Sequence, residues 1–433
     1  HLNPIVTHQA AETYKFGALI QNPSILYHYL LSFPYRLIEL FTHAPETQVI
    51  CLRLLNVALA VASLLVLRKL LKLLGVSGAL ANVLLLALAF TPLFMVLSAQ
   101  INYDNLLILA VSATFYLAAA FRQRLARGRF DTVTMLWLLC LCLFASLIKY
   151  AFLPVFLAIA AALAWQIIRR DREHKDVLKL AKAGFFRAAR PLRLALLVLL
   201  VAGGALFIRF YGVNIIRYHN PYPQCDQVLN IKDCSHYYAW ENFYVIEQYN
   251  RQHHVQALTG AAGMFRYTSY WFTLSTGELF GGIVPYLGDL YGSSFYYLVI
   301  VMLAGIMLIA TVRNLRRTLH GQCDLLLLLF ISAVYLAFLW GKNYHDYRRT
   351  GEALAIHGRY LLPVIISIYL LLAAGMRVAL KSQPRWAPAA KVVLASVVVL
   401  SFLAYGGFRP YLTFIMPRYG HLSPTNNFSP LDN

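Results

Sequence analysis

The amino-acid sequence predicts an all-α polytopic membrane protein, on the evidence of its composition, its long apolar blocks and its charge distribution. Of the 433 residues, 60% are hydrophobic and only 13% are charged, whereas a soluble domain carries about 25% charged residues. With their flanks, the apolar blocks supply the roughly 20 residues that a helix needs to cross a bilayer. Buried helices of a soluble protein would not repeat such blocks so often. The clearest blocks are residues 83–97, 194–207, 325–340 and 392–403.

The net charge of +20 is unevenly distributed along the chain. Nucleic-acid binding is one interpretation of so basic a protein. Here, however, most Lys and Arg residues gather in short segments between the apolar blocks, and few acids accompany them. Cytoplasmic loops of membrane proteins carry such an excess, so the pattern predicts a cytoplasmic position for these segments and no nucleic-acid partner. The segments are residues 68–72, 122–129, 169–193, 313–317 and 377–391.

Because successive basic segments must lie on the same side, an even number of helices separates each from the next. This parity predicts about ten transmembrane helices. They lie near residues 49–67, 80–98, 101–121, 325–340, 360–374 and 392–405, with two short helices between 129 and 169 that turn near Lys149, one helix that ends after 207 and one that begins near 294.

The predicted helices divide the chain into alternating membrane and outer regions. Because the sequence opens at His1 in a polar stretch without a start methionine, we also expect residues upstream and about eleven helices in the full-length protein. The regions are a first outer loop at 1–48, helices within 49–211, a large outer loop at 212–293, helices within 294–405 with a polar outer loop between 340 and 360, and an outer tail at 406–433.

One pair of cysteines is informative about the compartment. Cys225 and Cys234 lie nine residues apart in the large outer loop, close to two prolines. Non-cytoplasmic compartments such as a periplasm permit disulfide bonds. We therefore predict a Cys225–Cys234 disulfide. The other cysteines occupy apolar or boundary positions and show no metal-ligand spacing.

A single carboxylate stands at the outer mouth of a predicted helix pair. Asp104 precedes the apolar run 106–111, and a carboxylate at a helix boundary in the membrane is costly and therefore a functional candidate. Its functional interpretation is a catalytic base or metal ligand that faces an outer cavity. Its structural interpretation is a helix cap, because an aspartate in the first helical turn interacts favourably with the helix dipole.

Three basic residues, Arg53, Lys149 and Arg359, lie at the outer ends of predicted helices. Together they have the chemistry to hold a phosphate, whereas separately each would extend to the lipid head groups. Arg359 is the strongest candidate because it lies directly before a predicted helix. No cofactor is assigned, and a divalent metal stays possible, although the histidines lack a recognisable ligand spacing.

Several short motifs follow one another in order through most of the chain. Through them the chain resembles the GT-C superfamily of membrane glycosyltransferases, and most of all the family of predicted bacterial membrane proteins called DUF2142. The motifs are Asn22-Pro23 followed by Leu26-Tyr27-His28-Tyr29-Leu30, then Arg53-Leu54-Leu55-Asn56, then Pro92 with Ile101-Asn102-Tyr103-Asp104-Asn105, and finally Gly358-Arg359-Tyr360-Leu361-Leu362-Pro363.

The resemblance implies a GT-C-like fold in the bacterial inner membrane, with the active site on the periplasmic or extracellular side. It implies a polyprenyl-phosphate-linked sugar as donor and a glycan or lipid as acceptor. Asp104 matches a second acidic position of the family. The first acidic site would lie just upstream of His1, and Glu12 is the one acid that remains before Asn22-Pro23.

On this interpretation a carboxylate deprotonates the acceptor hydroxyl, and Arg359, with Lys149 or Arg53, stabilises the departing lipid phosphate. Membrane lipids surround the protein. The residues expected to contact the substrate are Tyr103, Asn102, Tyr360, His357 and Asn22.

Two other functions stay open. A transporter or flippase of a lipid-linked or anionic substrate predicts charges deep in the helices and spans interrupted by Gly or Pro. Charges within the predicted spans are scarce, and no internal repeat is evident in the sequence. The second alternative is a non-catalytic component of an envelope-assembly complex.

Overall fold

The computed structural model describes residues 22–381, except 188, 229, 235–237, 255–256 and 282–293, together with a few residues between 388 and 399. The described residues form helices and no strands. Five helical segments are long and apolar enough to cross a membrane, and a bent helix pair would make a sixth. The structure thus agrees with the predicted all-α membrane protein, while the number of about ten spans stays a prediction.

The candidate spans correspond in sequence to predicted helices. Three are single helices: α3 (Pro45–Leu73), α6 (Tyr103–Ala126) and α18 (Cys323–Thr350). Two are composite: Tyr150–His174 contains η2 (Tyr150–Phe152) and α8 (Leu153–His174), and Arg190–Tyr218 contains α10 (Arg190–Phe207), η3 (Ile208–Gly212) and α11 (Val213–Tyr218). The bent pair consists of α4 (Gly78–Ala89) and α5 (Pro92–Ser98). Shorter apolar helices are α7 (Thr132–Ile148) and the Leu298–Arg313 part of α16 (Ser294–Arg313).

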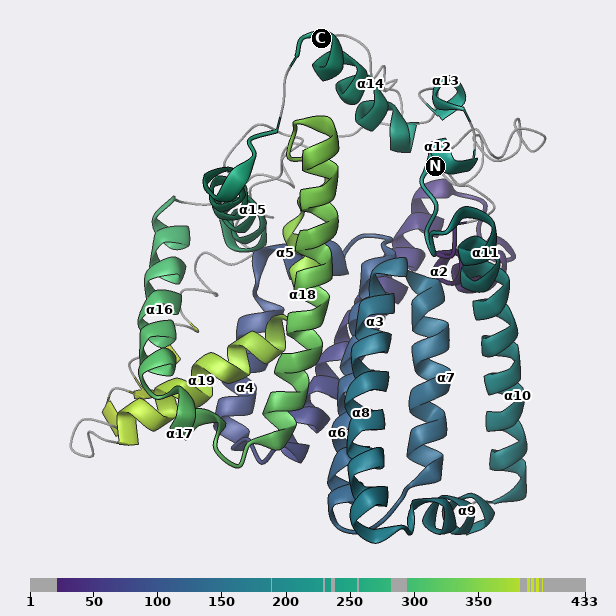
Figure 1. Ribbon diagram of the computed structural model, residues 1–433, viewed down its shortest axis with the longest axis vertical. Coiled ribbons are helices and arrows are strands. Elements are labelled where there is room, and N and C mark those ends of the chain that lie inside the picture. The colour runs from purple at the N-terminus through teal and green to yellow at the C-terminus, as the bar shows by residue number, and fades with distance from the viewer. Residues whose placement is uncertain are drawn as a thin grey trace.

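Most of these helices run side by side along the long axis of the molecule (Figure 1). The helices α9 (Val177–Arg187) and α17 (Leu315–Leu319) lie at one end, which we call the basic end because both belong to the basic segments. The helices α12 (Cys225–Val228), α13 (Ile231–Cys234) and α14 (Tyr238–Gln252) lie at the opposite end, which we call the loop end.

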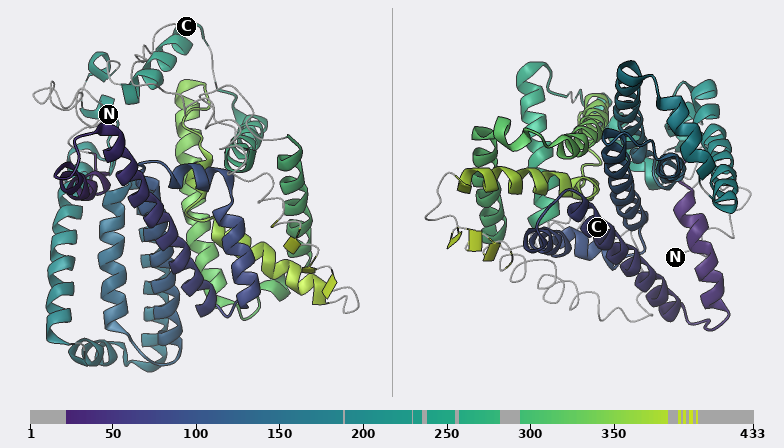
Figure 2. Two further views of the ribbon diagram at one scale, coloured as in Figure 1. Left: turned by 180° about the vertical axis from the view of Figure 1, so that it is seen from behind. Right: turned by 90° about the horizontal axis from the view of Figure 1, so that it is seen from below.

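The remaining helices lie across the bundle or beside it. Near the loop end, α2 (Leu26–Glu39) lies at the edge of the bundle and across its long axis, so that the view from below shows it along its length (Figure 2). The helix α15 (Gly260–Gly281) lies between the loop end and α16, and α19 (Ile365–Lys381) is strongly tilted in Figure 1. The predicted helix near 392–405 and the tail at 406–433 fall almost wholly outside the described residues.

Local sequence explains where several helices begin. Asn102 caps α6, because its side-chain oxygen accepts a hydrogen bond from the backbone N–H of Asp104 at 2.8 Å. Asp131 caps α7 in the same way, through Thr134 N–H at 3.1 Å. Proline occupies the first turn of α3, α5 and α10, where its missing N–H costs no helical hydrogen bond.

Two predicted helices differ in detail from those in the structure. The stretch 80–98 is not one straight helix, because Pro92 cannot continue the hydrogen-bond ladder and α5 leaves α4 at an angle of 69°. The polar stretch after Trp340 is not a loop, since α18 continues to Thr350. Trp340 stacks on Tyr344 with ring centroids 5.0 Å apart, and Lys342 pairs with Asp346, so contacts between residues four apart stabilise the extension.

Polar contacts tie α18 to its neighbours at the basic end. Asp324, in its first turn, forms an ion pair with Arg122 of α6 and accepts a hydrogen bond from Gln123 at 2.8 Å. The Gln123 amide also donates to the carbonyl of Leu73 at 3.1 Å. The start of α18, the end of α6 and the end of α3 are therefore joined at one place.

Candidate functional site

Asp104, Lys149 and Arg359 meet at the loop end, and we call these three residues the charge cluster. The Lys149 Nζ lies 2.8 Å from Asp104 Oδ1, and Arg359 Nε lies 3.9 Å from Asp104 Oδ2. The Asp104 side chain is only 2% exposed and the Lys149 side chain only 6%. Two cations therefore share one buried carboxylate, which leaves the cluster with a formal charge of about +1.

Two tyrosine rings enclose the ammonium group of the charge cluster. Lys149 Nζ lies 4.6 Å from the ring centroid of Tyr103 and 4.2 Å from that of Tyr360. Cation–π contacts of this kind contribute about 2 kcal/mol when the cation is desolvated. The hydroxyl of Tyr335 on α18 donates to the backbone carbonyl of Tyr360 at 2.9 Å and so joins the backbone at Tyr360 to α18. The predicted substrate residues Tyr103 and Tyr360 are thus neighbours of Lys149.

The structure separates the two interpretations of Asp104. The helix cap belongs to Asn102, so Asp104 is not needed for it. Asp104 instead faces the two cations, and its Oδ2 atom is buried without a hydrogen-bond partner in the described part of the chain. Its position is that of a counter-ion that holds Lys149 and Arg359 together.

Arg359 keeps its charge although it is largely buried. Burial alone would lower the pKa of the guanidinium, but the neighbouring Tyr360 and Asp104 outweigh burial and hold the pKa above its usual value. Its side chain is 28% exposed, more than that of either other member of the cluster. Arg359 is therefore the most exposed cation of the cluster.

The segment before Arg359 is fixed by α15. Glu278 of α15 accepts a hydrogen bond from the backbone N–H of Gly358, and its Oε1 lies 3.6 Å from Nδ1 of His357. Gly358 approaches α15 so closely that a Cβ atom there would lie 2.5 Å from the carbonyl oxygen of Ser275. His357, a predicted substrate residue, is thus engaged with α15. Sequence reasoning missed Glu278.

Replacing Gly358 with alanine is expected to displace Arg359 and to destabilise the protein by about 1–3 kcal/mol, because the added methyl group overpacks against backbone atoms of α15. A thermal melt in detergent would measure the loss. Gly341→Ala is the matched control, because a Cβ there meets nothing within 4 Å and alanine is favoured in a helix. Equal melting temperatures for the two variants would contradict the close contact.

The other predicted residues lie outside the charge cluster. The Asn22 side chain accepts from Ser24 N–H at 2.9 Å, and the Ser24 hydroxyl accepts from Tyr150 N–H at 3.1 Å, so Asn22 supports the turn that follows Lys149. Arg53 is exposed on α3 and has no ion-pair partner among the described residues. Glu12 lies outside the described residues.

A buried amide network supports the turn before α6. The Asn56 side-chain oxygen accepts from the hydroxyl of Tyr27 at 2.8 Å, from the Asn105 amide at 3.1 Å and from Asn102 N–H at 3.3 Å. Asn56 is fully buried. Sequence reasoning assigned it no role, although an asparagine within an apolar helix was a signal, because a buried amide needs partners. The network ties α2, α3 and α6 together beside Asp104.

A cavity of about 360 Å³ lies between α8, α18 and the loop end, and Lys149 and Tyr360 form part of its wall. Its lining divides into two chemical classes. The polar lining residues include Asn220, Tyr222, Gln224, Lys342, His345 and Asp346, and the apolar ones include Leu153, Pro154, Leu157, Phe338 and Leu339. Leu157 and Phe338 are more than half exposed, so the apolar part reaches the outer surface of the helix bundle.

The loop end contributes one wall of this cavity. Tyr222 stacks on Tyr150 with ring centroids 3.9 Å apart and an angle of 12° between the rings. Burial raises the pKa of Tyr222 to about 12, so its hydroxyl stays protonated and able to donate a hydrogen bond at neutral pH. The wall is thus an aromatic face with a hydroxyl donor.

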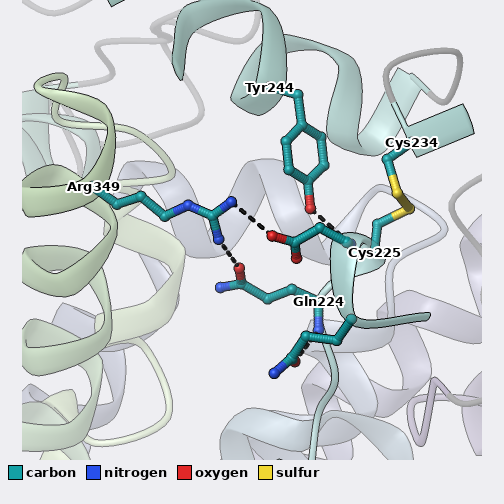
Figure 3. The surroundings of a disulfide bond; sticks show 7 residues. Gln224, Cys225, Cys234, Tyr244 and Arg349 are labelled. Carbon is teal, nitrogen blue, oxygen red and sulfur yellow. Dashed lines mark hydrogen bonds and ion pairs between the residues drawn. A yellow bond between two sulfur atoms is a disulfide. The ribbon is translucent and has the colours of Figure 1, made fainter. Parts of the chain in front are cut away.

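Arg349 fastens this wall to α18, as Figure 3 shows. Its guanidinium lies 2.7 Å from the Asp226 carboxylate and 3.0 Å from that of Glu247, and it donates to the side-chain oxygen of Gln224 at 2.8 Å. The predicted disulfide between Cys225 and Cys234 is confirmed, with the sulfur atoms 2.11 Å apart. The bond closes the loop directly beside Gln224.

Among the described residues, no three His, Cys, Asp or Glu side chains lie close enough together to hold a metal ion.

The chain was compared with known proteins in three ways. No protein-family model, no curated protein and no solved structure matches it.

Proposed function

We propose that the chain is a membrane glycosyltransferase that takes a sugar from a polyprenyl-phosphate-linked donor and transfers it to a glycan or lipid. The observation that carries the proposal is the two-part cavity beside the charge cluster. A lipid-linked phosphate is itself an amphiphile, with an anionic head and a hydrocarbon tail. A pocket with cations at one part and an apolar opening at another complements both.

The phosphate fits the charge cluster by its chemistry. Lys149 offers a point charge and Arg359 a planar fork of donors, the two groups that proteins most often use to bind phosphate. As the bond between sugar and phosphate breaks, negative charge builds on the phosphate oxygens, and fixed cations in a dry site stabilise it strongly. Asp104 contributes by holding both cations in position. A role for Asp104 as the base is less favoured, because Asp104 does not line the cavity and a cation faces each of its two oxygens.

The proposal includes the finer fold expectation of about ten spans in a GT-C-like arrangement. It also includes a side of the membrane: the basic end in the cytoplasm and the charge cluster on the periplasmic or extracellular face of the bacterial inner membrane. The grouping of the basic helices α9 and α17 at one end, and of the disulfide-bonded loop at the other, supports this orientation.

Binding of polyprenyl phosphate to the purified protein in nanodiscs tests the phosphate site. We expect it to bind at least about tenfold more tightly than the uncharged polyprenol of equal length, because only the phosphate engages the cations. Arg359→Gln should remove most of this difference. Arg348→Gln is the matched control, since Arg348 is an exposed arginine on the last turn of α18. Equal affinity for the two lipids would overturn the phosphate site, and absence of sugar transfer from any polyprenyl-phosphate sugar would overturn the enzyme.

One observation favours a second candidate function, a flippase or transporter. The 69° bend between α4 and α5 at Pro92 is a broken span of the kind that transporters place at binding sites. Movement of a fluorescent lipid-linked substrate across proteoliposomes, without any sugar transfer, would favour this candidate. Sugar transfer without movement would favour the glycosyltransferase.

A further inference from the structure

Asp346 is a buried carboxylate in the wall of the cavity that the charge cluster borders. It lies on α18, one turn before the helix ends at Thr350, and its side chain is 7% exposed. Lys342, one turn earlier, places its Nζ 2.8 Å from Asp346 Oδ2. Among the described residues that line the cavity, Asp346 is the only acid.

The two oxygens of Asp346 are unequally satisfied. Oδ2 accepts from Lys342, whereas Oδ1 is buried and has no hydrogen-bond partner in the described part of the chain. An unsatisfied buried acceptor costs about 1–3 kcal/mol, and more when it is charged. Asp346 lines the cavity, so a bound molecule is the nearest source of the missing donor, and the hydroxyl group of a sugar or lipid acceptor is a donor of the right kind.

Asp346 and Asp104 are placed for different tasks. Lys149 separates Asp104 from the cavity, since Lys149 lines it and Asp104 does not. Asp346 lines the cavity itself, in the wall formed by α18, while Lys149 follows α7 and belongs to the wall formed with α8. A molecule in the cavity therefore has a carboxylate on one wall and a cation on another.

We propose that Asp346 is the catalytic base that accepts the proton of the acceptor hydroxyl, an inference that rests on the proposed glycosyl transfer. The acceptor oxygen forms a bond to C1 of the donor sugar as its proton passes to the Asp346 carboxylate. The bond between C1 and the phosphate oxygen breaks, and its electron pair stays on the polyprenyl phosphate beside Lys149, the member of the charge cluster that lines the cavity. Lys342 holds Asp346 in position, because its Nζ lies 2.8 Å from Oδ2 and leaves Oδ1 free of a protein partner among the described residues.

Asp346→Asn tests this assignment in the full-length protein, with a polyprenyl-phosphate sugar as donor. We expect kcat to fall about 100-fold or more, as general-base catalysis of this size requires, while polyprenyl phosphate binding and the melting temperature stay unchanged. Asp346→Glu should recover part of the activity and keep the acidic limb of the pH–rate profile, which Asp346→Asn should lose. Glu352→Gln, an exposed acid two residues beyond α18, is the matched control.

Three outcomes would overturn the inference, and they are distinguishable. Transfer by Asp346→Asn at the wild-type rate would remove Asp346 from the reaction and leave the proposed function intact. If Asp346→Asn lowered both the melting temperature and donor binding, and Asp346→Glu recovered none of the activity, the role of the residue would be structural. Absence of transfer by the wild-type protein with any donor would overturn the proposed function and this inference together.

Discussion

Replacing Lys149 with methionine is expected to lower the free energy of unfolding by about 3 kcal/mol or more, the largest stability effect of any single substitution at the site. The substitution leaves the buried Asp104 carboxylate without its 2.8 Å partner, and Arg359 at 3.9 Å compensates only in part. Phosphate binding should be lost as well, because Lys149 is the cation of the cluster that lines the cavity. Unfolding in a detergent titration and polyprenyl phosphate binding in nanodiscs measure the two effects.

A double variant separates charge from packing. In Lys149→Met with Asp104→Asn the buried carboxylate is removed together with its partner, and the charge that remains belongs to Arg359, which is 28% exposed. Most of the lost stability should therefore return, while phosphate binding stays lost because the Lys149 ammonium is still missing. Lys69→Met is the matched control, since Lys69 is an exposed lysine on α3 at the basic end. If the double variant were as unstable as Lys149→Met alone, the buried pair would not be the source of the effect.

Replacing Arg349 with leucine is expected to release the loop-end wall of the cavity from α18. The guanidinium joins Asp226, Glu247 and Gln224 to the last turn of α18, and its removal leaves two carboxylates close together. Because Arg349 is 24% exposed, we discount the loss for solvent screening and expect about 2 kcal/mol. Limited proteolysis should then cut between residues 213 and 260 much faster than in the wild-type protein.

The neighbouring Arg348 provides the control for Arg349. Arg348→Leu changes the same residue type one position earlier, where the side chain is exposed. It should leave both the cleavage pattern and the melting temperature unchanged. If the two variants were cleaved equally fast, the contacts of Arg349 would not be what holds the loop end in place.

The sequence predicted the members of the charge cluster because of where they lie in the chain. Asp104, Lys149 and Arg359 each interrupt an apolar stretch at a predicted helix end, and charges are costly there. That the three meet depends on the packing of helices α6 and α7 and of the segment before α19, which no local pattern encodes. The even number of predicted helices between the basic segments places all three residues at the same end of the bundle. The structure adds the distances between their side chains.

The sequence did not reveal Asp346, Arg349 or Glu278, and the reason is physical. Residues 341–350 are polar, so hydropathy predicts a loop, yet side-chain contacts one turn apart and docking of the loop end extend α18 through them. Helix propensity and hydropathy are local properties of the sequence, so they do not reflect stabilisation by tertiary contacts. Glu278 was hidden for a related reason, because its partner, the N–H of Gly358, is a backbone group distant in the sequence.

The length of α18 has a consequence for how a lipid would reach the cavity. Its 28 residues rise by about 42 Å, whereas the hydrocarbon core of a bilayer is about 30 Å thick. With Asp324 at one edge of the hydrocarbon, the last two or three turns, which carry Lys342, Asp346 and Arg349, would project past the hydrocarbon into the layer of lipid head groups. A polyprenyl phosphate in the leaflet at the loop end would therefore hold its phosphate at the depth of the cavity. It would enter sideways between α8 and α18 without being lifted out of the membrane.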